Sequence, residues 1–336
     1  MVWLQFLLCL IVILFAGTKL ARYGDAISWK TGLGRVWIGL VLLAAITSIP
    51  ELVTGVSSAV LVGLPDLALG TLFGSNLFNL VILALLDTGY HYTPILSRVS
   101  LGHIISASLG ILLIAVAALG VLGRETLSGL TIGWVGIPSV AILLFYLFGI
   151  GQLFRLERGQ QSPPVEASPR QYERMSMRAV WFRFALSATA VIAAGIWVAF
   201  IGSEIAETTG WGTSFVGSLF LAVSSSMPEL VVTFAALRLG APDMAVADIL
   251  GSNMFNMAII FAVDLFYRQA SILSSVSSDH LIIAAVAIVM TLLVIVGLRF
   301  RQKQKTFRFI SWYGVALIGL YLLGFYVLFS QGIASV

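Results

Sequence analysis

The stretch SIPELV at residues 48–53 returns as SMPELV at residues 226–231, inside a chain of 336 residues. Each copy is followed by Pro-Asp, at residues 65–66 and 242–243, and then by GSNxFN, at residues 74–79 and 251–256. Between Pro65 and Tyr90, eleven of 26 positions are identical to the residue 177 positions later, far more than chance gives. The chain therefore contains a duplication, with repeats near residues 44–90 and 222–267.

The composition indicates the solvent that surrounds this chain. Hydrophobic residues make up 59% of it and charged residues only 10%, with a mean hydropathy of +1.03; soluble domains carry roughly 25% charged residues. Long apolar runs indicate membrane-spanning helices rather than the short alternating segments of a membrane β-barrel. We therefore predict an all-α polytopic membrane protein. Its single cysteine, Cys9, excludes an intramolecular disulfide.

Apolar stretches between polar breaks predict about ten transmembrane helices, at residues 2–20, 35–62, 67–87, 99–121, 130–152, 179–201, 213–238, 243–265, 280–298 and 309–330. The first five form one membrane repeat (residues 1–152), the last five form a second (residues 179–336), and residues 153–178 are a linker between them. Corresponding spans lie five apart in the chain, so the two copies cross the bilayer in opposite directions. The sequence thus predicts two inverted five-helix repeats, an architecture found in secondary transporters.

Basic residues predict the orientation, because cytoplasmic loops hold an excess of Lys and Arg. With the N-terminus outside, seventeen of the nineteen basic residues face the cytoplasm, and only Arg124 and Arg268 face outward. We expect a multi-pass protein of the plasma (inner) membrane with both termini outside and a cytoplasmic central linker. The net charge of +4 then reflects topology and contact with anionic lipid headgroups. It does not indicate nucleic acid as a partner.

Two prolines interrupt corresponding helices of the repeats. Pro50 and Pro228 lack an amide hydrogen for the carbonyl four residues earlier, so each helix should kink or unwind there. Glu51 and Glu229 follow directly, although an ionised carboxylate in mid-membrane costs about 2.5–3.5 kcal/mol. Hard cations are bound by carboxylates, carbonyls and other oxygens. We therefore favour a cation site over two protonated glutamates that only bond neighbouring helices.

The second motif of each repeat adds hydroxyl and amide groups. Ser75 and Asn79 lie four residues apart and share one helix face, as do Ser252 and Asn256. The glycine that begins each motif allows another backbone to approach closely. Each half therefore offers oxygen ligands toward its glutamate.

At these motifs the chain resembles the cation/calcium exchanger superfamily, whose two repeats carry T-S-x-P-E followed by G-S-N-x-x-N or G-S-N-x-x-D. The resemblance spans essentially the whole chain and is closest to prokaryotic sodium/calcium exchangers. In that family the matching residues bind Ca²⁺ and Na⁺ alternately in a shared cluster. The resemblance implies a ligand set of Thr47, Ser48, Glu51, Ser75 and Asn79 in the first repeat, with Ser225, Ser226, Glu229, Ser252 and Asn256 in the second.

Three features depart from the family pattern. Ile46 and Ser224 stand where glycine is frequent, which alters backbone flexibility at the break. Asn256 stands where sodium/calcium exchangers often carry aspartate, so one carboxylate is missing. Asp248, where the family commonly has asparagine, lies one helical turn before Ser252. It either restores an acidic group to the ion site or anchors the end of a helix.

The remaining acidic residues in the repeats have simpler interpretations. Asp66 and Asp243 each follow a proline at the start of a span and are predicted N-caps. Asp87 and Asp264 lie at span ends and are predicted to be solvated boundary residues. The three histidines have no spacing that indicates a metal site.

We predict a secondary-active calcium/cation antiporter, with Na⁺/Ca²⁺ exchange by alternating access around a midplane site that holds two glutamates. It is expected to need no cofactor and no obligate protein partner. Coupling to H⁺ stays open, because paired carboxylates also carry protons. A cation channel lined by the same residues is less favoured, because broken helices in inverted repeats favour alternating access. No nucleotide motif and no partnered catalytic base occur, so we do not expect an enzyme.

Overall fold

The computed structural model of this chain describes residues 2–90, 93–127, 129–159, 172, 175–209, 219 and 221–334. Within these ranges the structure is nearly all helical, apart from a short antiparallel ribbon of β1 (Thr131–Ile132) and β2 (Val135–Gly136). Eight of the described helical segments are long and apolar enough to cross a membrane, and Trp312–Leu328 is a shorter apolar helix. The chain is a multi-pass helical membrane protein, which confirms the predicted fold class.

The long uninterrupted helices are α1 (Val2–Thr31), α5 (Pro65–Gly89), α6 (His103–Leu122), α8 (Ile137–Gly159), α10 (Met177–Thr209), α14 (Pro242–Phe266), α15 (His280–Arg299) and α16 (Trp312–Ala334). One composite span contains α2 (Arg35–Trp37), the π-helical η1 (Ile38–Leu43), α3 (Ala44–Thr47), α4 (Ile49–Val56) and the π-helical η2 (Ser57–Leu61). The other contains α12 (Ala222–Ser225) and α13 (Met227–Arg238). Short connecting elements are η3 (Ile95–Ser97), α7 (Arg124–Leu127) and η5 (Ile272–Ser274).

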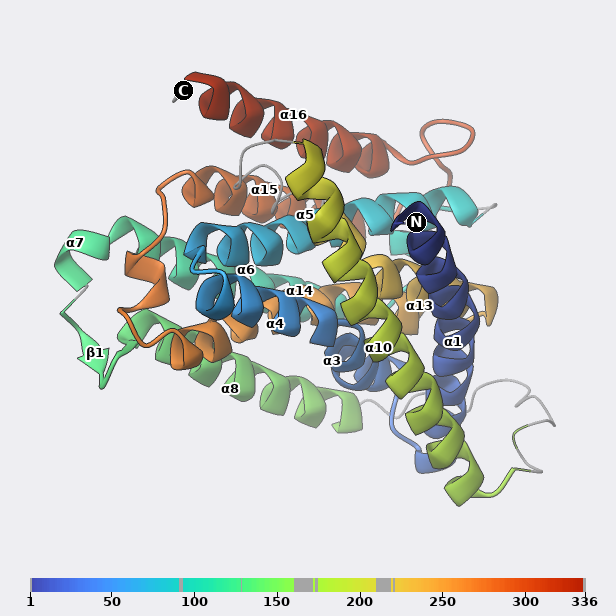
Figure 1. The fold of residues 1–336 in the computed structure, drawn as a ribbon. Coiled ribbons are helices and arrows are strands. Elements are labelled where there is room, and N and C mark those ends of the chain that lie inside the picture. The colour runs from blue at the N-terminus through green and yellow to red at the C-terminus, as the bar shows by residue number, and fades with distance from the viewer. Residues whose placement is uncertain are drawn as a thin grey trace.

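Helices α5 and α14 pack together and run in opposite directions (Figure 1). Asp66, at the start of α5, accepts a hydrogen bond from the Ser277 amide at 2.7 Å, just before α15 begins. Asp243, at the start of α14, accepts one from the Ser100 amide at 2.6 Å, just before α6 begins. The same contacts thus occur twice, at opposite ends of the bundle. This arrangement confirms the inverted repeats.

Helices α1 and α10 lie against each other and cross the other helices at a steep angle (Figure 1). Gly195 of α10 faces both broken spans: a Cβ there would lie 2.5 Å from Cγ of Pro50 and 3.2 Å from Cγ of Pro228. Only glycine leaves room for this contact. Residue 195 therefore lets α10 rest directly on the two interruptions.

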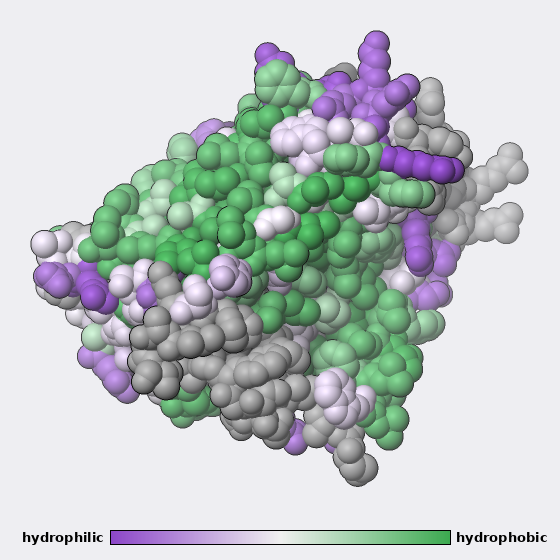
Figure 2. Space-filling model, turned by 90° about the horizontal axis from the view of Figure 1, so that it is seen from above, coloured by the Kyte–Doolittle hydropathy of each residue, from purple (hydrophilic) through white to green (hydrophobic). Residues whose placement is uncertain are grey.

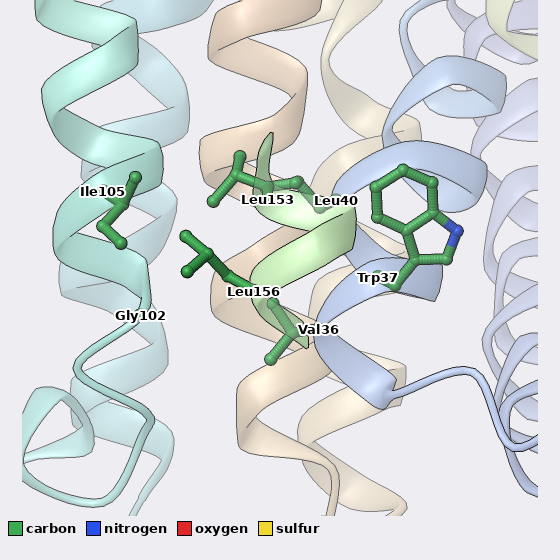
Figure 3. A pocket seen from close by; sticks show the side chains of 7 residues that line it. All are labelled: Val36, Trp37, Leu40, Gly102, Ile105, Leu153 and Leu156. Atoms are coloured by element: carbon green, nitrogen blue, oxygen red, sulfur yellow. The ribbon is translucent and has the colours of Figure 1, made fainter. Parts of the chain in front are cut away.

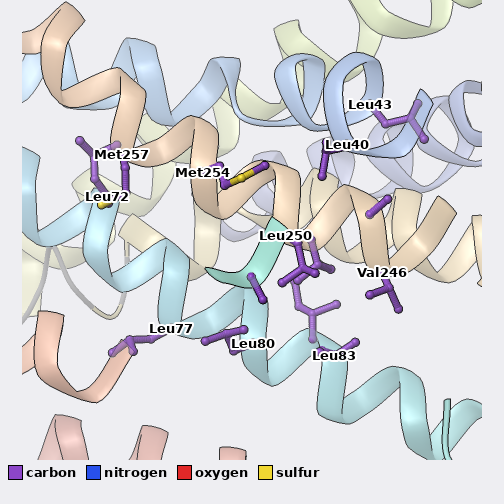
Figure 4. Packing of buried hydrophobic residues seen from close by; sticks show 14 of the residues in the cluster. Leu40, Leu43, Leu72, Leu77, Leu80, Leu83, Val246, Leu250, Met254 and Met257 are labelled. Carbon is purple, nitrogen blue, oxygen red and sulfur yellow. The ribbon is translucent and has the colours of Figure 1, made fainter. Parts of the chain in front are cut away.

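The outer surface of the bundle is apolar. Figure 2 shows a broad hydrophobic face with hydrophilic residues gathered toward its ends. Phe15 of α1, Phe148 of α8 and Phe182 of α10 expose about two thirds of their surface or more. Soluble monomers rarely expose apolar patches of this extent. A second apolar region lies inside, where Leu77 and Leu80 of α5 and Leu250 and Met254 of α14 are buried (Figure 4).

Helix α1 extends beyond the predicted end of the first span at residue 20 and continues to Thr31. Asp25 causes no break since its charge is paired: Nε of Arg35 donates to its Oδ1 at 2.7 Å. The Tyr172 hydroxyl donates to its Oδ2 at 3.3 Å. Burial and the neighbouring Asp25 charge raise the pKa of Tyr172 to about 12, so the phenol keeps its proton as a donor. Of the predicted linker, residues 160–171, 173 and 174 lie outside the described part, as does the predicted start of the span at 213.

The N-cap prediction for Asp66 and Asp243 is wrong. Leu64 and Ala241 occupy the cap positions, and each aspartate follows the first-turn proline. Both carboxylates instead contact the other half of the chain, where each Oδ1 lies 3.0 Å from a histidine Nε2, that of His280 for Asp66 and His103 for Asp243. A local rule for helix starts contains no information about such distant partners.

Asp87 and Asp264 are not solvated boundary residues, because both are fully buried. Asp264 accepts hydrogen bonds from the amides of Gly136 (2.9 Å) and Ile272 (2.7 Å). Asp87 accepts from the amides of Ile95 (2.9 Å) and Ser311 (2.7 Å), and from the hydroxyl of Tyr313 (2.5 Å). Each carboxylate therefore satisfies one amide of the loop that follows its helix and one amide just before another helix begins, α8 for Asp264 and α16 for Asp87.

Candidate functional site

The two broken spans have the same local geometry. Helix α3 ends at Thr47 and α4 begins at Ile49, with Ser48 between them at φ −90° and ψ 6°. Ser226 separates α12 from α13 at φ −86° and ψ 12°. The predicted interruptions are confirmed, and each is confined to a single serine. Both glutamates lie in the first turn of the following helix, where the positive end of the helix dipole favours a negative charge.

Each glutamate is held by a serine of the other repeat. Oγ of Ser226 donates to Oε1 of Glu51 at 2.7 Å, and Oγ of Ser48 donates to Oε1 of Glu229 at 2.9 Å. Ser75 of α5 adds a longer bond of 3.4 Å to Glu51. All five side chains are fully buried. The structure thus brings residues from both repeats, far apart in the chain, to one polar centre.

The other predicted hydroxyls surround this centre. Oγ1 of Thr47 lies 3.4 Å from Oγ of Ser252. Thr47 also donates to the Leu43 carbonyl at 3.1 Å, and Ser225 donates to the Ala222 carbonyl at 3.3 Å. These two hydroxyl groups bond their own helices while their oxygens keep further acceptor capacity.

Two asparagines that sequence reasoning missed complete the centre. Nδ2 of Asn79 donates to Oδ1 of Asn253 at 3.0 Å, and Nδ2 of Asn256 donates to Oδ1 of Asn76 at 3.1 Å. Asn76 and Asn253 are the third residue of each GSNxFN motif, so their recurrence was visible. The four-residue spacing from each serine points only to Asn79 and Asn256, whereas residues three apart, such as Asn76 and Asn79, also adjoin on a helix.

Asp248 lies inside the bundle, fully buried in the second turn of α14. The Thr233 hydroxyl donates to its Oδ2 at 3.0 Å. Thr233 lies one helical turn after Glu229, and Asp248 is close enough to Glu229 for their charges to interact. The carboxylate therefore adjoins the centre on the side of α13.

Several buried oxygens of the centre have no hydrogen-bond partner among the described residues: Glu51 Oε2, Glu229 Oε2, Asn79 Oδ1, Asn256 Oδ1 and Asp248 Oδ1. A buried polar atom left without a partner costs about 1–3 kcal/mol. All five atoms are acceptors, so each can take either a hydrogen-bond donor or a cation as its partner. Over the described residues, no three His, Cys, Asp or Glu side chains gather closely enough to hold a metal ion. The ligand set therefore needs the hydroxyls and amides, as is usual for hard cations.

Two glycines bring a neighbouring backbone close to Ser252. A Cβ on Gly251 would overlap the carbonyl of Leu40, and one on Gly39 would overlap the carbonyl of Met244. Segment η1 therefore lies directly on α14. This contact confirms the close approach predicted for Gly251, while the same expectation for Gly74 stays a prediction.

An apolar pocket elsewhere in the bundle is not part of this centre. Figure 3 shows its lining, which comprises Val36, Trp37, Leu40, Gly102, Ile105, Leu153 and Leu156. None of these is a candidate ligand, and none carries a charge.

Two inverted halves that share a buried acidic centre on interrupted helices define the class of protein as a secondary transporter. The family model described as sodium/calcium exchanger protein matches residues 1–155 and 179–330, and the chain belongs to this family. Its members are transporters rather than enzymes, and they carry Ca²⁺ and Na⁺ without a cofactor.

Individual relatives agree with this assignment. Inner membrane protein YrbG of Escherichia coli is 24% identical over 302 residues, which cover 84% of this chain and 86% of that protein. Sodium/calcium exchanger MaX1 of Methanosarcina acetivorans is 27% identical over 149 residues, 44% of this chain and 40% of that protein. The solved structure of the sodium-calcium exchanger NCX_Mj with Na⁺ and Sr²⁺ aligns with a TM-score of 0.70 at 21% identity. That alignment covers 96% of this chain and 98% of the solved one, and it shows a shared fold.

Proposed function

We propose that this protein exchanges Ca²⁺ for Na⁺ across the membrane by alternating access around the centre that holds Glu51 and Glu229. The observation that carries the proposal is the pairing of each glutamate with a serine of the other repeat, beside buried oxygens that lack a hydrogen-bond partner. Family membership and the relative named sodium/calcium exchanger support the choice of ions.

The proposed ligands are the buried oxygen-bearing side chains of both repeats: Thr47, Ser48, Glu51, Ser75, Asn79, Ser225, Ser226, Glu229, Asp248, Ser252 and Asn256. Glu51 and Glu229 together balance the charge of one Ca²⁺. The same oxygens can bind Na⁺, so one ion species excludes the other. This competition is the basis of exchange.

Alternating access is supported by the fact that both halves of the chain contribute side chains to the centre. A cation bound there would contact the carboxylate of one half and the hydroxyls of the other, so its ligands depend on how the two halves are placed. The centre is fully buried, which matches a closed state of a transporter better than an open pore. A channel is accordingly less supported.

Proton-coupled calcium exchange is the second candidate. Asp248 adds a buried carboxylate whose charge interacts with that of Glu229, and buried carboxylates can release Ca²⁺ by taking up protons as well as Na⁺. The two candidates differ only in the driving ion, so one experiment separates them.

We also propose a plasma-membrane location with both termini outside and the linker at residues 153–178 in the cytoplasm. The distribution of Lys and Arg supports this orientation. The name of the Escherichia coli relative, an inner membrane protein, supports the location.

The test is ⁴⁵Ca²⁺ uptake into proteoliposomes that contain the purified full chain. An outward Na⁺ gradient at equal pH should drive uptake above that of protein-free vesicles, whereas a pH gradient without Na⁺ should not. Uptake driven by the pH gradient alone would favour the proton-coupled candidate. Uptake that needs no counter-ion and does not saturate with Ca²⁺ would indicate a channel.

A further inference from the structure

Four asparagines meet where α5 crosses α14, and each repeat supplies two of them. Asn76, Asn79 and Asn256 are buried together with Asn253 in the interior of the bundle. Beside the two side-chain bonds between repeats, Nδ2 of Asn253 donates to the backbone carbonyl of Asn76 at 3.2 Å. The two helices are therefore joined by three amide hydrogen bonds at their crossing.

These bonds determine which end of each ligand amide faces the centre. An asparagine amide has an oxygen that accepts and a nitrogen that only donates, and a cation can bind only the oxygen. The nitrogens of Asn79 and Asn256 are taken by Oδ1 of Asn253 and of Asn76. Their own oxygens stay without a hydrogen-bond partner among the described residues. A rotated amide would instead direct N–H groups at the ion.

The two supporting asparagines are not equivalent. The backbone carbonyl of Asn76 can only accept, so Asn253 must direct its nitrogen there and its oxygen toward Asn79. Asn76 has no such constraint within the described structure, because its own Nδ2 has no hydrogen-bond partner. Asn253 is therefore fixed in one orientation, whereas Asn76 can turn over.

We propose that Asn76 and Asn253 are positioning residues, each of which directs the amide oxygen of a ligand in the opposite repeat, Asn256 or Asn79, toward the transported cation. Asn253 is the fixed member of the pair and Asn76 the adjustable one. This inference rests on the proposed function for the identity of the cation. It explains why the motif carries two asparagines three residues apart in both repeats.

One test compares two substitutions at position 76. Asn76→Leu removes the acceptor for Asn256, while Asn76→Asp keeps an acceptor of nearly the same shape. We expect the leucine variant to raise the KM for Ca²⁺ by about tenfold or more, and the aspartate variant to stay within about threefold of wild type. Calcium titration of the purified full chain by calorimetry should give the same order. Equal KM values for wild type and the leucine variant would overturn the proposal, as would equally raised values for the two variants.

A second test uses nearly isosteric substitutions that preserve packing. In Asn256→Asp the neighbouring Asn76 can turn and donate its free Nδ2, so the new carboxylate stays directed at the ion. In Asn79→Asp the carboxylate faces the fixed oxygen of Asn253 and is repelled. Asn79→Asp should therefore raise the Ca²⁺ KM by about tenfold, whereas Asn256→Asp, whose added charge stays directed at the ion, should lower it. Equal effects, or the reverse order, would contradict a fixed Asn253.

Control measurements separate this inference from the proposed function. If wild-type vesicles take up no Ca²⁺ in exchange for Na⁺, the proposed function fails, and calorimetric Ca²⁺ binding still tests the asparagines. If wild type exchanges and Glu229→Gln does not, while Asn76→Leu keeps the wild-type KM, only the positioning role fails. A purely structural role would lower the yield of folded protein without shifting the KM.

Discussion

The proposed site puts Glu51 and Glu229 at membrane depth, where an ionised side chain costs about 2.5–3.5 kcal/mol. A charge-assisted hydrogen bond from a serine returns about 1.5–3 kcal/mol, and the N-terminal end of the following helix adds a smaller share. Each glutamate keeps a second oxygen without a partner among the described residues. In the proposed site, a cation bound to that oxygen offsets the rest of this cost, so the stability of the fold and the affinity for the ion depend on the same atoms.

Replacement of either glutamate tests this directly. Glu51→Gln and Glu229→Gln keep the size of the side chain and an acceptor for the serine, but they remove the charge that balances Ca²⁺. Each should reduce Na⁺-driven ⁴⁵Ca²⁺ uptake to the level of protein-free vesicles while the variant elutes as folded protein. Glu125→Gln, on an exposed position in α7, is the matched control and should transport normally. Near-normal flux in either site variant would refute the site assignment.

Asp248 raises a separate question, because its equivalent in the first repeat is the uncharged Thr71. Asp248→Asn keeps the bond from Thr233 but removes one negative charge close to Glu229. Loss of one neighbouring charge in a buried site is expected to change the affinity by about tenfold, which corresponds to about 1.4 kcal/mol. We expect the Na⁺ concentration for half-maximal exchange to rise by this factor, with a smaller change in the Ca²⁺ KM. Unchanged Na⁺ dependence would assign Asp248 to structure alone.

At the scale of elements, the decisive feature is that each repeat contains one helix interrupted at a single serine. The interruption directs Ser48 and Ser226 across the molecule to the opposite glutamates. Gly195 of α10 covers both prolines, and Gly251 of α14 admits the backbone of η1. The prolines thus interrupt the two helices, and the glycines let neighbouring helices pack closely against the interruptions.

Removal of one proline should separate stability from transport. Pro228→Ala restores an amide hydrogen that can bond the Ser224 carbonyl, so α12 and α13 can join into one helix and draw Ser226 away from Glu51. One added hydrogen bond is worth about 0.5–1.5 kcal/mol, so thermal unfolding in detergent should move to higher temperature while the transport rate falls. Pro138→Ala, at the start of α8, is the control because proline breaks no bond there. A variant that is more stable and transports at the wild-type rate would contradict the role of the break.

The sequence was sufficient for those elements whose determinants are local or repeated. Prolines predict the interruptions, apolar length predicts the spans, and the duplication predicts the inverted halves and brings both glutamates to equivalent places. It was insufficient where the bonding partner of a charged side chain lies far away in the sequence. The apolar pattern does not predict that α1 continues to Thr31, because Asp25 pairs with the distant Arg35 and Tyr172. Asp66 and Asp243 were misassigned because their histidines belong to the other half.

At the scale of the whole molecule, the two halves are joined at three levels. His280 with Asp66 and His103 with Asp243 connect them at the two ends of the bundle. The reciprocal bonds between serines and glutamates connect them in the middle. Because the halves are inverted, the two His–Asp pairs lie at opposite ends of the bundle, with the serine–glutamate bonds between them. The basic residues predict which of these ends faces the cytoplasm.

Cysteine labelling in whole cells tests the orientation. In a background where the buried Cys9 is replaced by alanine, Gln304→Cys should react only with reagents that cross the membrane. Ala270→Cys should react with impermeant reagents added outside. Both positions are exposed, so accessibility in the folded protein does not differ between them. Impermeant labelling at position 304 and none at 270 would reverse the proposed topology.

The exchange of serines between the halves also affects how the protein is made. Glu51 is synthesised 175 residues before Ser226, its shortest hydrogen-bond donor. At about 5–20 residues per second, that interval lasts about 10–35 s. During this time the first half rests in the membrane with a glutamate whose partner does not yet exist, and Ser75 is the donor within its own half. The nascent first repeat is therefore an incomplete product that depends on the later arrival of the second.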